Sequence, residues 1–297
     1  MPGSRAAVVV NPTKFDDLAK FREAVCAAMA ARGWREPLWL ETTAGDPGRG
    51  MAGKAAAEHV DLVLACGGDG TVIACAEGLA GCRTPLAVIP AGTGNLLARN
   101  LGLPLGLDAA LVVALSGDDM PLDMGSANGK PFVVMAGVGL DAKMLESTSE
   151  SLKKRFGWAA YAISALRHLR DRPMRVRLRA DGGPPLRRRA GGVVVGNVGW
   201  LQGGVPLLPD AEPDDGLLDV LVLAPRGWIG WLALVADVLL RRRASGRMAR
   251  LAFRELRIDL GRQQLWELDG EVIGQTRELQ VTVQAGALLL RVPAPAA

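Results

Sequence analysis

The residues whose types and spacing point most directly to chemistry form a glycine-rich turn after an apolar run, residues 61–66. The turn comprises Gly67, Gly68, Asp69, Gly70 and Thr71. Glycines lack the Cβ atoms that keep a bulky anion off the backbone, and a helix starting here directs unpaired N–H groups at the same gap. The Asp69 carboxylate would repel phosphate unless it held a metal ion, a water or a lysine. The turn therefore predicts nucleotide chemistry with a cation.

A second polar glycine turn, residues 90–95 (PAGTGN), follows the next apolar run, residues 86–89. If both runs are neighbouring parallel strands, both turns lie at the carboxyl ends of strands, where open α/β sheets bind ligands. Either turn alone is compatible with an ordinary tight turn. Together they predict one crevice to which Thr71, Thr93 and Asn95 contribute polar contacts.

A third glycine-rich segment, residues 48–54 (GRGMAGK), satisfies both Gly-x-Gly-x-x-Gly and the first part of a phosphate-binding P-loop. However, Ala55 stands where a P-loop has the Ser or Thr that holds magnesium. The segment also lacks the direct junction of strand and turn that positions a phosphate. We therefore do not expect the nucleotide to bind here.

The two turns belong to a longer set of motifs, which also includes Val10-Asn11-Pro12, Leu96-Leu97-Ala98-Arg99 and Leu268-Asp269-Gly270-Glu271. In these residues and their order, the chain resembles the diacylglycerol kinase catalytic family. That family includes bacterial lipid kinases and sphingosine and ceramide kinases, and it is distantly related to NAD kinases. The resemblance implies ATP as phosphoryl donor, bound between an α/β domain and a β-rich domain.

The resemblance also implies roles for individual residues. Nucleotide contacts would come from Asn11, Pro12, Thr42 or Thr43, Gly67, Gly68, Asp69, Gly70, Thr71, Gly92, Thr93 and Asn95. The catalytic carboxylates would be Asp269 and Glu271, one of which takes the proton of the acceptor, together with Asp69. A magnesium ion would be held by the Asp215 side chain and by carbonyls near Glu212 and Leu217, with Asp123 linked to this metal network.

Some positions depart from the family pattern. Ile73 and Ala74 replace polar residues after the first turn, and Thr13-Lys14 replaces a Ser-Gly pair. Lys14 would compensate by reaching a phosphate as a point charge. The sequence does not decide whether Asp269 and Glu271 share a strand face or lie on a hairpin turn, because Asp-Gly also favours such a turn.

The elements that must position these residues follow from the apolar pattern. Apolar runs near residues 6–11, 37–40, 61–66 and 86–89 alternate with helical stretches, which predicts a parallel sheet covered on both faces. Thr13 with Asp16 resembles a capping box for the first helix. After about residue 120, short strands predict an antiparallel β-sandwich: 132–135, 174–178, 192–195, 217–222, 251–258, 280–283 and 288–292. We expect an ATP-binding domain, residues 1–122, and a β-rich acceptor-binding domain, residues 123–297, whose last strand could return to the first.

Composition limits the classes of protein that fit. The 297 residues carry a net charge of only +4 and few aromatic side chains, which disfavours a nucleic-acid-binding protein. Four cysteines without metal-ligand spacing and the lack of an apolar leader indicate the cytoplasm. Apolar segments flanked by basic residues, 153–170 and 228–243, suggest transient peripheral contact with the anionic inner membrane surface. Core packing with a solvated end explains the same pattern, and a homodimer is left open.

The leading hypothesis is an ATP- and Mg²⁺-dependent kinase that phosphorylates the hydroxyl of a membrane lipid such as diacylglycerol. One alternative is a kinase of another hydroxyl acceptor, a sphingoid base or NAD. A second is a catalytically silent sensor of nucleotide or lipid that kept the fold. Phosphoryl transfer needs alignment of donor and acceptor, offset of phosphate charge and one proton acceptor, and the motifs supply candidates for each.

Overall fold

The computed structural model describes residues 3–139, 173–201, 205–225, 229–230, 233, 237 and 248–294. The chain forms two compact units, one of residues 1–122 with 286–297 and the other of residues 123–285. Strands β5 (Asp118–Ala127) and β16 (Glu271–Val292) pass from one unit into the other. The helices expected over 159–170 and, for most of its length, over 228–240 lie outside the described residues. Within the described part of the chain, no helix is long and apolar enough to cross a bilayer.

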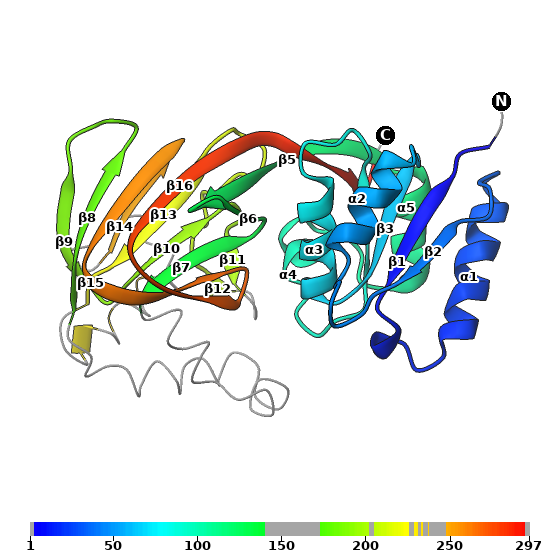
Figure 1. Cartoon of the computed structure of the whole chain (residues 1–297), viewed down its shortest axis with the longest axis horizontal. Coiled ribbons are helices and arrows are strands. Elements are labelled where there is room, and N and C mark those ends of the chain that lie inside the picture. Colours follow the sequence, from blue (N-terminus) through cyan, green and yellow to red (C-terminus); the bar gives the residue numbers. More distant parts are fainter. Residues whose placement is uncertain are drawn as a thin grey trace. The chain divides into compact units, whose positions relative to one another are not determined.

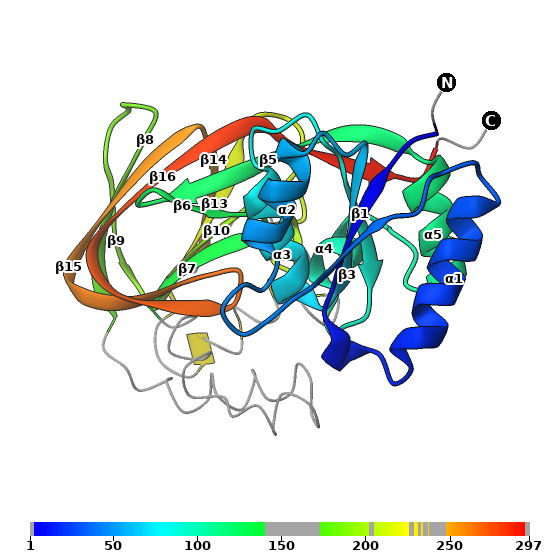
Figure 2. The same cartoon turned by 45° about the vertical axis from the view of Figure 1, so that its right-hand side comes forward.

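The first unit is a parallel sheet with helices on both faces (Figures 1 and 2). Its strands lie in the order β2-β1-β3-β4, and the end of β16 adds to β4 through Leu290 and Leu86. The strands are β1 (Ala6–Val10), β2 (Leu38–Glu41), β3 (Leu62–Gly67) and β4 (Leu86–Pro90). The helices are η1 (Pro12–Lys14), α1 (Leu18–Ala30), α2 (Arg49–Ala57), α3 (Asp69–Leu79), α4 (Leu96–Asn100) and α5 (Leu107–Ser116).

The core of this unit explains why the strands are continuously apolar. Every residue of β1 and β3 is buried, because α1 and α5 pack on one face and α2 and α3 on the other (Figure 2). On the first face, Phe21, Val25 and Met29 of α1 join alternate strand residues in one cluster. A strand buried on both faces needs apolar side chains at every position. This burial fixes the carboxyl edge of the sheet, where the candidate site lies.

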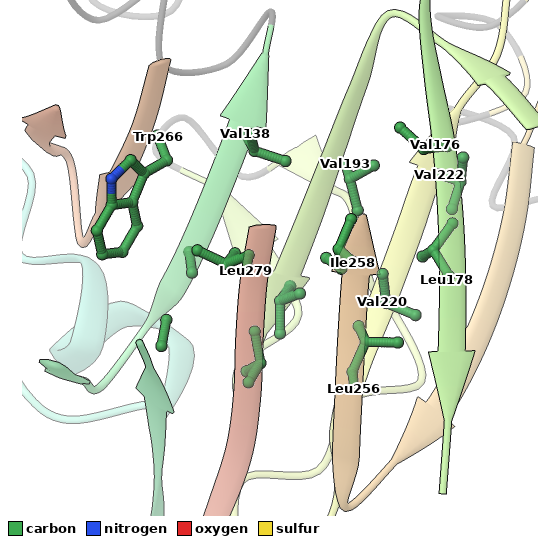
Figure 3. Close-up of a cluster of buried hydrophobic side chains, with 14 of the residues drawn as sticks. Val138, Val176, Leu178, Val193, Val220, Val222, Leu256, Ile258, Trp266 and Leu279 are labelled. Carbon is green, nitrogen blue, oxygen red and sulfur yellow. The ribbon is translucent and has the colours of Figure 1, made fainter. Parts of the chain in front are cut away.

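The second unit is built from antiparallel strands in the order β14-β13-β10-β7-β15-β16, with β5 on β16 and β8 on β15. These strands are β6 (Lys130–Phe132), β7 (Met135–Gly139), β8 (Met174–Ala180), β9 (Leu186–Ala190), β10 (Gly192–Gly196), β13 (Leu218–Leu223), β14 (Met248–Phe253) and β15 (Glu255–Leu268). A separate short pair consists of β11 (Trp200–Leu201) and β12 (Val205–Pro206). Figure 3 shows the buried side chains that these strands share, among them Val138, Val193, Ile258 and Trp266.

The predicted fold class, a parallel α/β domain joined to a β-rich domain, is confirmed, but several element boundaries were wrong. The strand expected over 132–135 is broken at Val133 and Val134, whose N–H groups donate to the Asp269 carboxylate. The strand expected over 251–258 ends at Phe253, because the N–H groups of Arg254 and Glu255 donate to Asp181.

Further differences concern the last strand, the N-cap of the first helix and two elements that were not expected. The two strands expected at 280–283 and 288–292 are parts of one long strand, β16. The N-cap of α1 is Asp17, whose side chain accepts from the N–H of Lys20 at 2.9 Å, and not the expected pair of Thr13 and Asp16. The apolar pattern also missed α5 and the arginine-rich strand β9.

Candidate nucleotide site and acidic turns

The two glycine turns meet at the carboxyl edge of the parallel sheet. Gly67 ends β3 opposite Pro90 of β4, and the N–H of Ala91 donates to the Gly67 carbonyl at 2.8 Å. A Cβ added to Gly92 would lie 2.7 Å from the Cα of Gly68, which is too close for any side chain. The glycines are therefore required in part because the two backbones touch each other.

Asp69 holds these two turns together. Its Oδ2 accepts from the N–H of Asn95 at 2.9 Å, and its Oδ1 accepts from the N–H of Leu96 at 2.5 Å. Asn95 adopts a left-handed φ of 47°, and its side chain bonds both the N–H and the carbonyl of Gly92. Backbone N–H groups at the start of α4 thus offset the charge that we expected a metal ion, a water or a lysine to offset. The geometry gives Asp69 a positioning task.

The other predicted nucleotide contacts end neighbouring strands at the same edge. Asn11 follows β1, and its N–H donates to the carbonyl of Cys66 at 2.9 Å. Thr42 follows β2, and its N–H donates to the Val10 carbonyl at 2.9 Å. The Asn11 side chain accepts from Thr13, which orders the start of η1 at Pro12. Parallel strands bring these separate sequence positions together because their carboxyl ends share one edge.

The predicted contacts differ in how accessible they are. Thr71 is 4% exposed, and it packs against Gly67 so closely that a Cβ there would meet its side chain at 2.7 Å. Thr93 and Thr43 are exposed, as is Gly70, which has no atom within 4 Å of an added Cβ. Lys14 Cε lies 3.7 Å from the Cβ position of Gly68. The open positions at this edge are therefore Gly70 and Thr93, with a lysine side chain beside the first turn.

The rejected P-loop-like segment has its own local explanation. The Asp46 Oδ1 accepts from the N–H groups of Gly48 and Gly50 at 2.9 and 3.2 Å. The carboxylate thus binds the N–H groups at the start of α2, where a phosphate would bind in a true P-loop. Gly48 has a φ of 137°, a backbone conformation that glycine alone tolerates easily. The glycines in this segment serve the turn before α2.

The late acidic pair lies on a two-residue hairpin turn between β15 and β16. Asp269 and Gly270 have φ values of 48° and 90°, and Leu268 pairs with Glu271 across the turn. Positive φ at both central residues is the geometry that Asp-Gly favours in tight hairpins. The hairpin alternative is therefore the correct one, and the shared strand face is not observed.

The two carboxylates of this turn have different surroundings. Asp269 accepts three backbone N–H groups at 2.8 Å, from Val133 to Oδ2 and from Val134 and Met135 to Oδ1. Glu271, the first residue of β16, is exposed. A carboxylate that accepts three N–H bonds is held in one orientation. Asp269 thus shapes the loop, whereas Glu271 can reach a ligand.

The predicted metal residues surround one buried aspartate. Asp123 is 2% exposed, its Oδ2 accepts from the Gly216 N–H at 2.6 Å, and its N–H donates to the Pro213 carbonyl at 2.8 Å. The exposed Asp215 accepts from the Leu217 N–H at 2.8 Å through one oxygen, Oδ1. Glu212 is also exposed. Asp123 therefore fixes the shape of the turn 212–217 while Asp215 points to its exterior.

Asn197 belongs to the same network and was missed by the sequence reasoning. Its Nδ2 donates to the carbonyls of Asp123 at 2.6 Å and Val133 at 3.2 Å, and the residue is 1% exposed. It thereby connects Asp123, which shapes the turn 212–217, to the segment that Asp269 holds. The available signal was one amide side chain inside an otherwise apolar run, residues 192–198, because buried polar groups are retained where they are hydrogen-bonded.

Asp219 lies close to this acidic turn. Burial, together with repulsion from Asp215 and Asp210, raises the pKa of its carboxyl to about 6, while the Arg250 guanidinium opposes the rise. Burial in turn lowers the pKa of Arg250, against the effect of the two aspartates. Neutral pH therefore places a partly buried negative charge beside other carboxylates.

Asp219→Asn should stabilise the protein more at pH 8 than at pH 5. The folded-state pKa of about 6 lies above the ordinary aspartate value of 3.8, so the stability that this carboxyl supplies is present below pH 3.8 and is lost as the pH rises through about 6. The amide removes that loss. The check is the difference in Tm between variant and wild type, measured at pH 8 and pH 5 with a chelator present. An equal difference at both pH values would contradict a raised pKa of Asp219.

Comparison with known proteins agrees with this geometry. The family model of the diacylglycerol kinase catalytic domain matches residues 5–127, and the model of the YegS C-terminal NAD kinase beta sandwich-like domain matches residues 133–292. A probable lipid kinase YegS-like of Pseudomonas aeruginosa is 34% identical over 92% of this chain and 90% of its own length.

Two further relatives agree. A diacylglycerol kinase of Bacillus subtilis is 32% identical over 74% of this chain and 73% of its own length. A solved diacylglycerol kinase from Bacillus anthracis has the same fold, with a TM-score of 0.74, 23% identity and coverage of 98% and 97% of the two chains. The matches cover both units, and the chain therefore belongs to the diacylglycerol kinase family as a lipid kinase-like enzyme.

Proposed function

We propose that this enzyme transfers the γ-phosphate of ATP, with Mg²⁺, to the hydroxyl of a membrane lipid such as diacylglycerol. The observation that carries this proposal is the contact between the two glycine turns, joined by Asp69 at the edge where four parallel strands end. That edge supplies backbone N–H groups and space without side chains, which a triphosphate requires. The first unit then acts as the nucleotide domain and the second as the acceptor domain.

ATP fits the open positions of this edge. Gly70, with nothing within 4 Å of an added Cβ, leaves room for a phosphate close to the start of α3. Thr93 and Lys14 are exposed beside it and would donate to phosphate oxygens. Asn11, Thr42 or Thr43 would contact the rest of the nucleotide from neighbouring strand ends. Thr71 and Asp69 would not contact the phosphates themselves and would hold the two turns in position.

Glu271 is the better proton acceptor of the late pair. Its carboxylate is exposed, whereas the oxygens of Asp269 already accept three backbone N–H groups. In the transfer step, the acceptor oxygen bonds the γ-phosphorus, the bond from that phosphorus to ADP breaks, and the hydroxyl proton passes to Glu271. Asp269 keeps Glu271 in place by fixing the turn that carries it.

The turn 212–217 suits a magnesium ion. Mg²⁺ prefers oxygen ligands and is commonly held by one or two carboxylates with carbonyls and waters. Asp215 offers a carboxylate, and carbonyls near Glu212 and Leu217 would complete the protein ligands around a turn that Asp123 already shapes. Bound there, Mg²⁺ would supply charge and rigidity to the acidic turn.

Asp215→Asn should weaken the response to Mg²⁺. The amide is a poorer ligand than the carboxylate, and even the loss of a supporting group at a metal site lowers affinity by about 10-fold or more. We therefore expect the Mg²⁺ concentration that gives half-maximal thermal stabilisation to rise by at least about 10-fold. Asp214→Asn, at an exposed neighbour outside the ligand set, is the matched control. Equal effects of the two substitutions would show that Asp215 is not a ligand of the metal.

A direct transfer assay tests the proposed function. The enzyme is incubated with γ-labelled ATP and Mg²⁺ and with diacylglycerol, sphingosine or NAD as separate acceptors. Labelled diacylglycerol supports the proposal. If sphingosine or NAD is labelled and diacylglycerol is not, the acceptor is the labelled compound and not diacylglycerol. Nucleotide binding without transfer to any acceptor would favour a sensor. The cytoplasmic location and the homodimer stay predictions.

A further inference from the structure

The β8–β9 hairpin carries a concentrated set of arginines on one face. Arg175 pairs with Arg189 across the hairpin, and Arg177 pairs with Arg187. Arg179 continues the same side of β8, since alternate residues of a strand share a face. We call the five residues Arg175, Arg177, Arg179, Arg187 and Arg189 the arginine face. Four of them are exposed, and Arg177 is partly buried.

The opposite side of the hairpin anchors it to the core. Met174, Val176 and Leu178 alternate with the arginines of β8 and are at most 3% exposed, and Ala190 of β9 is fully buried. Figure 3 shows Val176 and Leu178 beside Val222 and Ile258 of other strands. The arginines therefore project from a fixed hairpin, so that little backbone entropy is lost when they bind a partner.

The charges of the arginine face are poorly balanced by nearby acids. The face borders a hollow of about 570 Å³, lined by Arg175, Arg177, Arg187, Arg188, Arg189 and the acidic Asp259. Asp259 already accepts from Arg257 at 3.3 Å, and Arg257 also pairs with Glu278 at 2.8 Å. Within the described part of the chain, no carboxylate forms an ion pair with the five arginines. Several guanidinium groups held together without acids form an anion-binding surface.

We propose that the arginine face docks the enzyme on the headgroups of anionic phospholipids. The guanidinium fork binds phosphate oxygens in pairs and is easily desolvated, which suits phosphodiester headgroups. Aromatic side chains that would stack on nucleic-acid bases are missing from the lining of the hollow. The choice of a lipid surface rests on the proposed function, because a kinase with a membrane lipid as acceptor must reach that membrane.

The arginine face is separate from the candidate catalytic residues. Strand β15 pairs with β8 through Leu256–Leu260, whereas its opposite end leads into the Asp269–Gly270 turn. Substitution of the arginines therefore leaves Glu271 and the turn that Asp269 holds intact. Docking and phosphoryl transfer can be measured independently.

The test uses the full-length chain, without ATP, and vesicles made of equal parts of phosphatidylglycerol and phosphatidylcholine. The triple substitution Arg175→Gln, Arg187→Gln, Arg189→Gln should lower vesicle binding by about 100-fold, since each basic side chain at an anionic leaflet contributes roughly fivefold. Wild-type binding should also fall with added salt and vanish on phosphatidylcholine alone. The matched control, Arg5→Gln, Arg35→Gln, Arg83→Gln, removes three exposed charges from the first unit and should bind within a few fold of wild type.

Two further measurements decide the interpretation. The triple substitution Arg175→Lys, Arg187→Lys, Arg189→Lys keeps the positive charge and should keep most of the vesicle binding. If it lost as much binding as the glutamine variant, the proposal would be overturned. The proposal would also be overturned if the wild-type protein did not bind the vesicles, or if the control variant lost as much vesicle binding as the glutamine variant. It would be overturned as well if the glutamine variant lost binding to RNA and kept binding to vesicles. Transfer to detergent-dispersed diacylglycerol should be unchanged in all variants. If that transfer fails in the wild type while docking holds, the proposed function is wrong and the docking surface stands.

Discussion

Glu271→Gln should lower kcat by about 10² to 10⁴, because loss of a general base costs that range of rate. The side chain is exposed, so its amide should leave the free energy of unfolding within about 0.5 kcal/mol of wild type. Binding of ATP should also be unchanged, since the proposed role of Glu271 concerns the acceptor hydroxyl. The measurement is steady-state transfer to diacylglycerol, paired with thermal unfolding of the same sample.

Asp269→Asn should give a different combination of effects. The amide has one oxygen where the carboxylate has two, so its NH₂ group faces a backbone N–H of Val133, Val134 or Met135. A buried donor without an acceptor costs about 1–3 kcal/mol of stability. Both activity and Tm should therefore fall. A variant that loses all activity at unchanged Tm would instead make Asp269 the base, and a fully active Glu271→Gln would remove Glu271 from that role.

Gly70→Ala should raise the KM for ATP by about 10- to 100-fold, because the added methyl group would push a phosphate away from the backbone N–H groups. Loss of one hydrogen bond to a charged group costs roughly 1.5–3 kcal/mol, which corresponds to that range. The added methyl group meets no protein atom within 4 Å, and alanine favours a helix more than glycine does. The protein should therefore keep or slightly raise its Tm. Because the methyl group contacts no protein atom, a loss of ATP affinity would mean that the ligand binds close to the backbone at Gly70.

The control for that prediction is Gly106→Ala, at an exposed glycine before α5 that also has nothing within 4 Å of an added Cβ. It should change neither KM nor Tm by much. Gly67→Ala and Gly92→Ala should instead lower Tm, because their methyl groups would lie 2.7 Å from Thr71 and from the Gly68 backbone. If Gly70→Ala left KM unchanged, the phosphates would bind away from the start of α3.

The local pattern was sufficient to find β1, β2, β3 and β4 of the first unit. Four parallel strands were identified from apolar runs; β1 and β3, covered on both faces, show no polar alternation. The turns after β3 and β4 could then be placed at one edge, since parallel strands share their carboxyl ends. That reasoning did not reveal that Asp69 bonds the N–H groups of Asn95 and Leu96, which are distant from it in sequence.

The β-rich unit was less predictable because distant side chains set its boundaries. Asp269 interrupts the strand expected at 132–135, and Asp181 separates β14 from β15, through hydrogen bonds to residues 73 or more positions away. The basic run 187–189 gave no sign of a strand, because its arginines lie on an exposed hairpin and lack apolar alternation. Only the pairing of β8 with β9 gathers them into one face.

The amino-acid sequence by itself determined the four parallel strands of the first unit, the two glycine turns and the family of the enzyme. Those features depend on neighbouring residues: apolar runs, missing Cβ atoms and short motifs. Tertiary structure decided which carboxylates are exposed and which accept backbone N–H groups, and where the arginines gather. These properties depend on hydrogen bonds and strand pairing between distant segments, which form only when the chain has folded.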